Sequence, residues 1–232
     1  MLAIVPARGG SKRVVGKNKR LLAGLPLISW TLRACRGSKY VDEIVVSTDD
    51  PDIASISRAE GVSRVHQRSA DLATDTSPTM DAVIDLLAWL EREGTVFDVI
   101  FLAQPTSPLR TRDHIDAALT VFSEKYPASI IGVTQSPHPR EWLGAIGPDG
   151  DMVEFRSETR LDLASHSLPK SYLVNGAIYI TSREILHRDR TFFTPDNLSA
   201  FFMAPRDSID IDTEFDFEVA EYLLSTKNSS AR

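Results

Sequence analysis

The chain of 232 residues contains only one cysteine, Cys35. A lone thiol cannot form an internal disulfide, and this composition is typical of proteins in a reducing compartment, so we expect a cytoplasmic location. Cys35 lies in an amphipathic stretch, which favours a buried packing role over a nucleophilic one.

Long apolar segments are also missing. No run approaches the roughly eighteen apolar residues that a membrane span requires, so the sequence predicts no association with a membrane. The first residues enter a short apolar stretch directly, without the basic segment and long apolar region of a secretory signal. Cysteine and histidine show no metal-ligand spacing, and no catalytic triad emerges; His138 and His166 are expected at the surface.

Acidic residues are absent from positions 1–41, which carry nine lysines or arginines. The remaining residues carry 17 basic and 32 acidic side chains, and the whole chain has a net charge of −6. An acidic protein with one basic end is unsuited to broad nucleic-acid binding. This asymmetry favours a small anionic ligand at one place.

The basic end begins with Ala3-Ile4-Val5, which predicts a short buried strand that Pro6 terminates. Glycines then alternate with cations, at Arg8, Gly9, Gly10, Lys12, Arg13, Gly16, Lys17, Lys19 and Arg20. Glycines let backbone amides approach an anion closely, and the cations neutralise it, so the stretch favours a polyphosphate cradle over a merely solvated basic loop. It has neither the Walker spacing nor a G-x-G-x-x-G pattern.

Apolar runs and amphipathic stretches alternate as far as residue 125. We expect strands at 3–5, 43–48, 63–66, 97–103, 128–134, 173–181 and 201–204, and helices at 26–38, 51–60, 77–93, 111–125 and 213–224. This alternation predicts an α/β fold with a mostly parallel central sheet and flanking helices. Residues 135–170 break the pattern with three prolines and mixed polarity, which predicts an excursion such as a β-ribbon, of a kind that often pairs subunits. Residues 226–232 are polar and expected to fray.

Ligands of open parallel sheets bind beyond the carboxyl ends of the strands. The loops predicted there are unusually polar, at 7–20, 47–50, 103–110 and 205–213. In the loop 103–110, two prolines surround amide and hydroxyl groups, an arrangement that could orient a substrate or form a plain capped turn.

The segment DSIDIDT places Asp210 and Asp212 two residues apart, so an extended backbone would project both to one side. Two adjacent carboxylates repel unless a cation joins them, and oxygen ligands suit magnesium. The alternative is an acidic segment, including Asp207, that merely leads into the helix opened by Thr213. The isoleucines at 209 and 211 favour the metal site, because they would bury the opposite side.

These motifs resemble a known family. The stretches PARGGSKRVVGKN, LAQPTSPLRT, NGAIYI and DSIDIDTEFD, in this order, are similar to the CMP-sialic acid synthetases, which are cytidylyltransferases of nonulosonic acids. The resemblance implies a Rossmann-like nucleotidyltransferase fold, one domain over 1–232, and a small protruding dimerisation arm at about 135–170. The related octulosonate enzymes typically open with PARxxSxRLPGKPL, whereas this chain has GKNKRLL. A non-catalytic nucleotide-binding regulator would share the fold but should lack the cations or the acidic pair.

The resemblance implies that CMP passes from CTP to the anomeric hydroxyl of a nonulosonic acid, with Mg²⁺ as cofactor and a homodimer as the assembly. By position in the motifs, the catalytic residues are Lys17, Asp212, Arg8 and Lys12. The residues that the resemblance assigns to the nucleotide are Arg8, Gly9, Gly10, Ser11, Lys12, Lys17, Asn18, Arg68 and Thr79. At the position of Thr79, a serine is usual in the family. The sugar is assigned to Gln104, Lys170, Asn175, Tyr179, Phe192 and Phe193, and the metal to Asp210 and Asp212. Ser165 and Leu173 stand where arginines are expected, so Lys170 and His166 are the candidates for the sugar carboxylate, and N-acetylneuraminic, legionaminic and pseudaminic acid all remain compatible.

Overall fold

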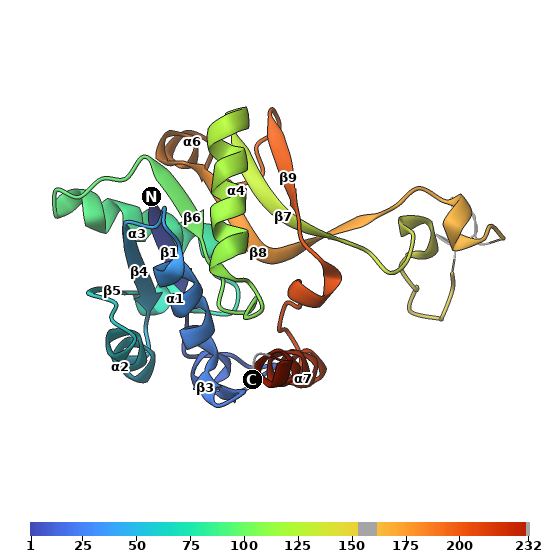
Figure 1. Ribbon diagram of the computed structural model, residues 1–232, viewed down its shortest axis with the longest axis horizontal. Coiled ribbons are helices and arrows are strands. Elements are labelled where there is room, and N and C mark those ends of the chain that lie inside the picture. Colours follow the sequence, from blue (N-terminus) through green and yellow to red (C-terminus); the bar gives the residue numbers. More distant parts are fainter. Residues whose placement is uncertain (153–161, 231–232) are drawn as a thin grey trace.

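The protein is built on a seven-stranded, mostly parallel sheet with flanking helices, as the sequence predicts (Figure 1). The computed structural model describes residues 1–152 and 162–230, with side chains as far as residue 226. The strands of the sheet are β1 (Leu2–Pro6), β4 (Glu43–Thr48), β5 (Arg64–Gln67), β6 (Val99–Leu102), β7 (Ser129–Gln135), β8 (Tyr172–Ser182) and β9 (Leu198–Phe202). The helices are α1 (Leu27–Gly37), α2 (Pro51–Ala59), α3 (Thr79–Arg92), α4 (Arg112–Lys125), α6 (Arg183–Asp189) and α7 (Glu214–Ser230).

The strands lie in the order β5-β4-β1-β6-β8-β7-β9. Among the strands that the structure describes in this sheet, β8 alone runs against the others, pairing antiparallel with both β6 and β7. The carboxyl ends of β1, β4 and β6 therefore meet at one edge, which is where such sheets bind ligands.

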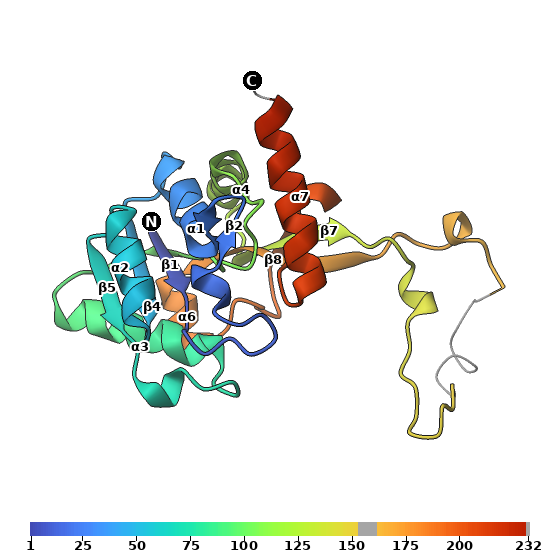
Figure 2. The ribbon, with the colours of Figure 1, turned by 90° about the horizontal axis from the view of Figure 1, so that it is seen from below.

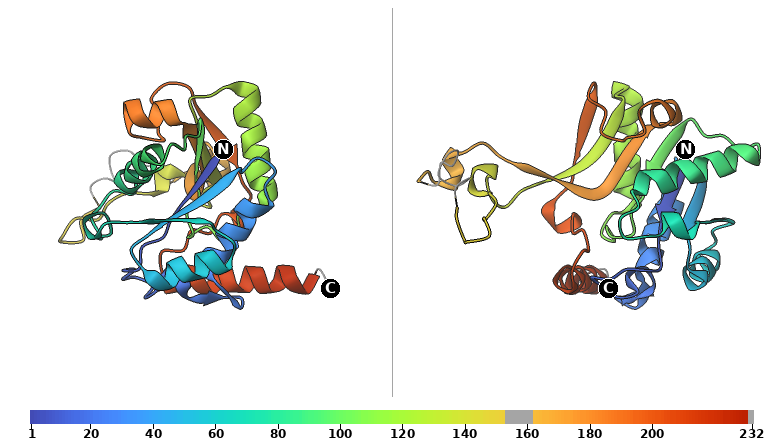
Figure 3. Two further views of the ribbon diagram at one scale, coloured as in Figure 1. Left: turned by 90° about the vertical axis from the view of Figure 1, so that its left-hand side faces the viewer. Right: turned by 180° about the vertical axis from the view of Figure 1, so that it is seen from behind.

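Helices cover both faces of the sheet (Figure 3). Along β1, Ala3 and Val5 face a core that includes α1, α2 and α4. Leu2 and Ile4 face the other way, into a core formed with α3 and α6. Burial on both faces explains why the strands read as continuous apolar runs. Cys35 is fully buried in the first core, as predicted.

A small hairpin and the last helix form a third apolar cluster. Strands β2 (Leu21–Leu22) and β3 (Leu25–Pro26) are joined by Ala23 and Gly24, both with positive φ. Leu22 and Phe217 belong to one buried cluster, which fixes α7 against the hairpin. Figure 2 shows α7 crossing this side of the molecule. The segment just before α7 is thereby held next to the opening loop.

The excursion after β7 leaves the body of the protein as a long arm (Figures 1 and 2). Its base is a two-stranded ribbon in which Gln135 pairs with Tyr172. Beyond that pair, the described residues of the arm form two 3-10 turns, Arg140–Trp142 and Ser165–Ser167, and no strand. The ribbon that the structure describes is therefore the one at the base, and residues 153–161 of the expected excursion lie outside the described residues. His138 and His166 are exposed there, as predicted.

Some elements differ from the sequence-based expectation. The hairpin of β2 and β3 and helix α6 were not expected; Ser182 begins α6 by accepting a hydrogen bond from the amide of Ile185. Strand β9 begins at Leu198, three residues early, directly after Asn197 with φ of 58°. Helix α7 continues to Ser230, beyond the expected end at residue 224, and the last two residues of the stretch expected to fray lie outside the described residues. In the described part of the chain, no helix has the length and apolar character to cross a membrane.

Candidate active site

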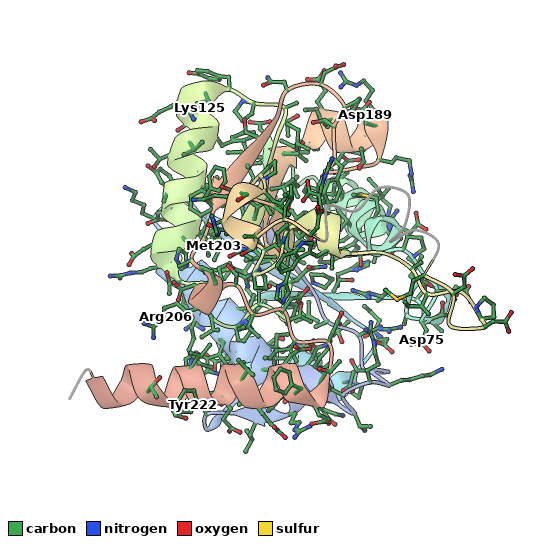
Figure 4. The ribbon with its side chains drawn as sticks, turned by 90° about the vertical axis from the view of Figure 1, so that its right-hand side faces the viewer. Asp75, Lys125, Asp189, Met203, Arg206 and Tyr222 are labelled. Atoms are coloured by element: carbon green, nitrogen blue, oxygen red, sulfur yellow. The ribbon has the colours of Figure 1, made fainter. Side chains whose placement is uncertain are left out.

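An open cavity of about 200 Å³ lies beyond the carboxyl ends of β1, β4 and β6, and we refer to it as the main cleft. Figure 4 shows Asp75 at the same end of the molecule as α7, opposite the end where α4 and α6 finish at Lys125 and Asp189. Distant parts of the sequence contribute the lining: Pro6, Arg8, Ser11, Lys12, Arg13, Val14, Lys17, Asn18, Arg68, Thr79, Gln104, Pro105, Thr106 and Asp212. Nine of the residues assigned from the sequence are among them.

The opening loop is held in place by backbone contacts. The amide of Gly9 donates to Asp49 Oδ1 at 2.9 Å. A Cβ atom at Gly9 would lie 2.8 Å from Asp50 Oδ2, so the close packing requires glycine. Gly16 has φ of 61°, and its left-handed conformation starts the 3-10 turn Lys17–Lys19. These glycines shape the loop, whereas Gly10 is exposed with open space around it.

Asn18 is buried, and its Nδ2 donates to the backbone oxygen of Arg8 at 2.9 Å. This bond ties the two ends of the basic loop together. Asn18 also lines the main cleft, and its bracing role is one that the sequence did not indicate. Its contact with the nucleotide stays a prediction.

Two of the predicted phosphate ligands are held by one acidic residue. Arg8 Nη1 lies 2.9 Å from Asp75 Oδ1, and Lys12 Nζ lies 2.5 Å from Asp75 Oδ2. The hydrogen bond from Lys12 holds the pKa of Asp75 below its usual range. Two cations that converge on one carboxylate have the geometry to converge on a phosphate.

Lys17 lies deeper, with its side chain 13% exposed. Its Nζ donates to the backbone oxygen of Ile211 at 2.6 Å and lies 3.5 Å from Asp212 Oδ1. Burial lowers the pKa of Lys17, while Asp212 and Asp210 oppose that shift. The ammonium group therefore links the basic loop to the acidic segment.

The acidic pair is positioned by the residue between its members. Ile211 is fully buried, and its amide donates to Thr106 O at 2.8 Å. Asp210 is open to solvent on one side, yet protein atoms surround most of it, and this desolvation raises its pKa. Asp212 is half-exposed and also lies 3.4 Å from Arg13 Nη1. Asp212 is thus in direct contact with Lys17, and Asp210 adds to the effect by raising the pKa of Lys17 electrostatically.

Whether a magnesium ion fits this site depends on the side chains that are available as metal ligands. Among the described residues, no group of three or more histidine, cysteine, aspartate or glutamate side chains could hold a metal ion. Asp210 and Asp212 supply two carboxylates beside a cationic loop, and magnesium is commonly bound through one or two carboxylates with phosphate and water oxygens. The pair fits a cation whose remaining ligands come with the substrate, so the magnesium assignment stays a prediction.

Arg68 and Thr79 form another wall of the cleft. Thr79 is the exposed first residue of α3. Arg68 is only 6% exposed and donates to the side chain and backbone of Ser47, so its guanidinium is fixed.

The residues assigned to the sugar do not all lie in the main cleft. Gln104 lines the main cleft. The Tyr179 ring lies edge-on to Phe192 and Phe193, at centroid distances of 5.9 and 6.0 Å. Burial, with a smaller contribution from Asp210, raises the pKa of Tyr179 to about 12. Phe192 belongs to the core below α3 and is 3% exposed, whereas Phe193 is 51% exposed, so only Phe193 presents its ring to solvent.

Asn175 and Lys170 do not line the main cleft within one chain. Asn175 is buried. Its side-chain Nδ2 donates to Ser208 Oγ, and its Oδ1 accepts from the backbone amide of Ala177, which fixes the irregular part of β8. Lys170 is exposed on the arm and lines a separate cavity with His166. Their assignment to the sugar stays a prediction.

Sequence reasoning also missed residues of the site. Thr106 accepts the bond that fixes Ile211, and Arg110 is buried with hydrogen bonds to the backbone oxygens of Gln104 and Ala177. Both lie in the loop 103–110, whose polarity was the available signal. The roles themselves depend on long-range contacts that spacing does not encode.

Known proteins resemble the chain along nearly its whole length. A family model described as cytidylyltransferase matches residues 2–189. The chain is 37% identical over 224 residues to the CMP-N,N'-diacetyllegionaminic acid synthase of Legionella pneumophila, covering 97% of this chain and 96% of that protein. It is 30% identical over 232 residues to the pseudaminic acid cytidylyltransferase of Campylobacter jejuni, covering 99% and 98%.

The fold is similar to that of a solved CMP:2-keto-3-deoxy-manno-octonic acid synthetase complexed with CTP. The TM-score is 0.69 at 17% sequence identity, with 97% of this chain and 98% of that chain covered. This similarity confirms the predicted Rossmann-like nucleotidyltransferase fold. Together with the sequence matches, it shows that the chain belongs to the cytidylyltransferase family.

Proposed function

We propose that the protein transfers CMP from CTP to the anomeric hydroxyl of a nonulosonic acid and releases pyrophosphate. One observation carries the proposal: the cations of the opening loop line one cleft together with Asp212. In that cleft Lys17 lies beside Asp212 and within the electrostatic influence of Asp210. The relatives whose names specify N,N'-diacetyllegionaminic and pseudaminic acid support the choice of sugar class.

The cations would bind and orient the triphosphate. In this reading, Arg8 and Lys12 exchange their contact with Asp75 for phosphate oxygens, because a polyphosphate carries more negative charge than one carboxylate. Lys17, held by Ile211, would face the α-phosphate and stabilise the charge that develops in the transition state. Arg68 and Thr79 would hold the cytidine end.

Asp210 and Asp212 would hold a magnesium ion together with phosphate oxygens, and the ion would neutralise phosphate charge as the bond to the leaving group breaks. Asp212 would help to accept the proton of the attacking hydroxyl, which lies on the sugar side of the cleft. Gln104, Tyr179 and Phe193 would contact the sugar there, with the exposed Phe193 ring suited to the apolar methyl of an N-acyl group.

We also propose that two chains pair through the arm at about 135–170. Leu143 and Ile146 are 59% and 58% exposed on it, and Leu173 and Val174 are each 47% exposed at its base. Such exposed apolar side chains on a thin projection favour a partner surface. The enzyme would work in the cytoplasm, where CTP is available.

The experiment that tests the function is pyrophosphate release with CTP and a panel of nonulosonic acids and 3-deoxy-manno-octulosonate. Turnover should require a nonulosonic acid, CTP in preference to UTP, and a divalent cation that excess chelator removes. Turnover with the octulosonate alone would overturn the sugar class, and full activity in chelator would overturn the metal assignment. CTP binding without turnover on any sugar would favour a nucleotide-binding regulator.

A further inference from the structure

Arg68 is a buried cation whose orientation depends on Ser47. Its Nε donates to Ser47 Oγ at 3.1 Å, and its Nη2 donates to Ser47 O at 2.9 Å. Within the described residues, no carboxylate forms a direct ion pair with Arg68, although Asp49 and Asp85 act on it electrostatically. Its hydrogen bonds go to the neutral groups of Ser47, and it lines the main cleft. A buried charge held this way responds to any change in the groups behind it.

Behind Ser47 lies a histidine that the proposed reaction does not use. Ser47 of β4 and His66 of β5 are direct partners in the parallel ladder, so their side chains share one face of the sheet. Ser47 is 1% and His66 5% exposed. His66 Nδ1 lies 3.2 Å from Ser47 Oγ, and His66 Nε2 lies 3.3 Å from Asp85 Oδ2 of α3. The Trp89 ring closes the site at a centroid distance of 5.3 Å from His66.

The direction of each hydrogen bond follows from the chemistry of the groups. The Nε of arginine can only donate, so Ser47 Oγ accepts from Arg68 and its own proton is free to point to His66 Nδ1. An imidazole that accepts at Nδ1 carries its proton on Nε2 when neutral. That proton then points to the carboxylate of Asp85. In the other tautomer, the lone pair of Nε2 would face the carboxylate of Asp85, and two acceptors would repel each other.

We propose that Asp85, His66 and Ser47 form a hydrogen-bond relay that fixes the guanidinium of Arg68 for nucleotide binding. His66 is then a positioning residue, because it acts on the ligand only through Ser47 and Arg68. The proposal rests on the proposed function, since it takes the ligand at Arg68 to be CTP.

The relay should weaken when His66 becomes protonated. A proton on Nδ1 would turn the hydroxyl proton of Ser47 away from His66, so Ser47 Oγ would have to accept from two cations, and a second positive charge would stand beside Arg68. The charged groups that face His66 are Asp85 and Arg92 from α3 and Arg68 from the segment after β5. Burial lowers the pKa of His66, opposed by Asp85, so the neutral form prevails at neutral pH and the change occurs on acidification.

The first test needs no nucleotide. Nitrogen-15 NMR of the full chain at pH 7.5 should show a neutral His66 with its proton on Nε2, and an Arg68 Nε proton protected from exchange. In His66→Phe, which retains a ring against Trp89, the Arg68 proton should exchange at least tenfold faster. A proton on Nδ1 of His66, or unchanged exchange in the variant, would overturn the relay.

The second test measures CTP binding in magnesium buffer by calorimetry. His66→Phe should bind CTP about tenfold more weakly than wild type at pH 8, the effect expected when a hydrogen bond to a charged group is lost. The ratio of the two dissociation constants should fall towards one as the pH is lowered through the range in which His66 titrates in the NMR spectra. Comparing the two proteins at each pH cancels the ionisation of CTP itself. Asp85→Ala should weaken binding about threefold, while Asp85→Asn, whose amide oxygen still accepts from Nε2, should stay within twofold of wild type.

His187→Gln is the matched control, because His187 also pairs with a carboxylate of α3, Glu91 at 2.9 Å, but is not among the residues that line the main cleft. Melting temperatures distinguish a variant that is misfolded from one in which only the Arg68 guanidinium is misoriented. Because Asp85 is half-exposed, its variants are expected to fold. A binding ratio that does not change with pH would leave His66 a purely structural residue and overturn the proposal. If the wild type fails to bind CTP, the proposed function fails, whereas the NMR result still decides the relay.

Discussion

Lys17 donates a hydrogen bond from Nζ to the backbone oxygen of Ile211 at 2.6 Å, although 194 positions separate the two residues. The bond joins the basic opening loop to the acidic segment before α7. It places an ammonium group beside Asp212 and within the electrostatic influence of Asp210. Basic and acidic side chains that lie far apart in the sequence are therefore brought together at one point of the fold.

Lys17→Ala should reduce the turnover number of the enzyme by about 10²–10³, the usual cost of losing a donor that stabilises transition-state charge. Binding of CTP should weaken much less, because Arg8 and Lys12 still hold the phosphates. Single-turnover rates and CTP titrations on the same preparations separate the two effects. Lys39→Ala, an exposed lysine beside Tyr40, is the control and should behave as wild type. A variant that loses CTP affinity but keeps its turnover number would make Lys17 a binding residue only.

Phe192 and Phe193 should respond differently to truncation, although they are adjacent. Phe192→Ala opens a cavity in the core below α3 and should lower the free energy of unfolding by about 3–5 kcal/mol. Phe193→Ala removes an exposed ring, so its melting temperature should stay near that of wild type. If Phe193 contacts the sugar, the variant should lose roughly 1–2 kcal/mol of binding free energy for the sugar. The Michaelis constant for the sugar should then rise, and that for CTP should not.

Measuring both Michaelis constants and the melting temperature on each variant tests this separation. A selective sugar defect in Phe192→Ala, with its stability intact, would reverse the assignment of the two rings. No sugar defect in either variant would remove the aromatic pair from the substrate site.

This contrast illustrates what the sequence could predict. Strands such as β1 and β6 were predicted because burial on both faces leaves an apolar run. Lys17 was assigned from its place in the basic opening stretch, and Asp212 from its spacing to Asp210 in DSIDIDT. Periodicity could not tell which phenylalanine faces the core, since the turn after α6 decides it. The bracing role of Asn18 and the internal bonds of Asn175 depend on partners elsewhere in the fold, which spacing does not encode.

Ile146→Asp and Leu143→Asp should convert the expected dimer into monomers. Each change places a charge on an exposed apolar side chain of the arm, where a partner would have to bury it without a counter-charge. Sedimentation velocity at micromolar concentration gives the assembly state. Val96→Asp is the control, because Val96 is similarly exposed, at 52%, on the loop between α3 and β6. A wild-type chain that sediments as a monomer would refute pairing through the arm.

Gly176→Ala should impair catalysis more than stability. Gly176 has φ of 70°, and a Cβ atom there would lie 3.0 Å from Asp210 Oδ2 and 3.1 Å from Gln104 Oε1. The left-handed backbone alone should cost about 1–2 kcal/mol in unfolding free energy for alanine. The methyl group would in addition displace the carboxylate and the amide by a few tenths of an ångström, and catalysis depends steeply on such placement.

Gly24→Ala separates the two effects. Gly24 has φ of 86° and nothing within 4 Å of a Cβ atom, so the substitution carries the backbone cost without touching the site. Both variants should lose similar stability in urea unfolding, whereas only Gly176→Ala should lose turnover, by at least tenfold. Equal turnover in the two variants would show that the oxygens around Gly176 move aside freely. It would also mean that the position of Asp210 is not set by the irregular turn of β8.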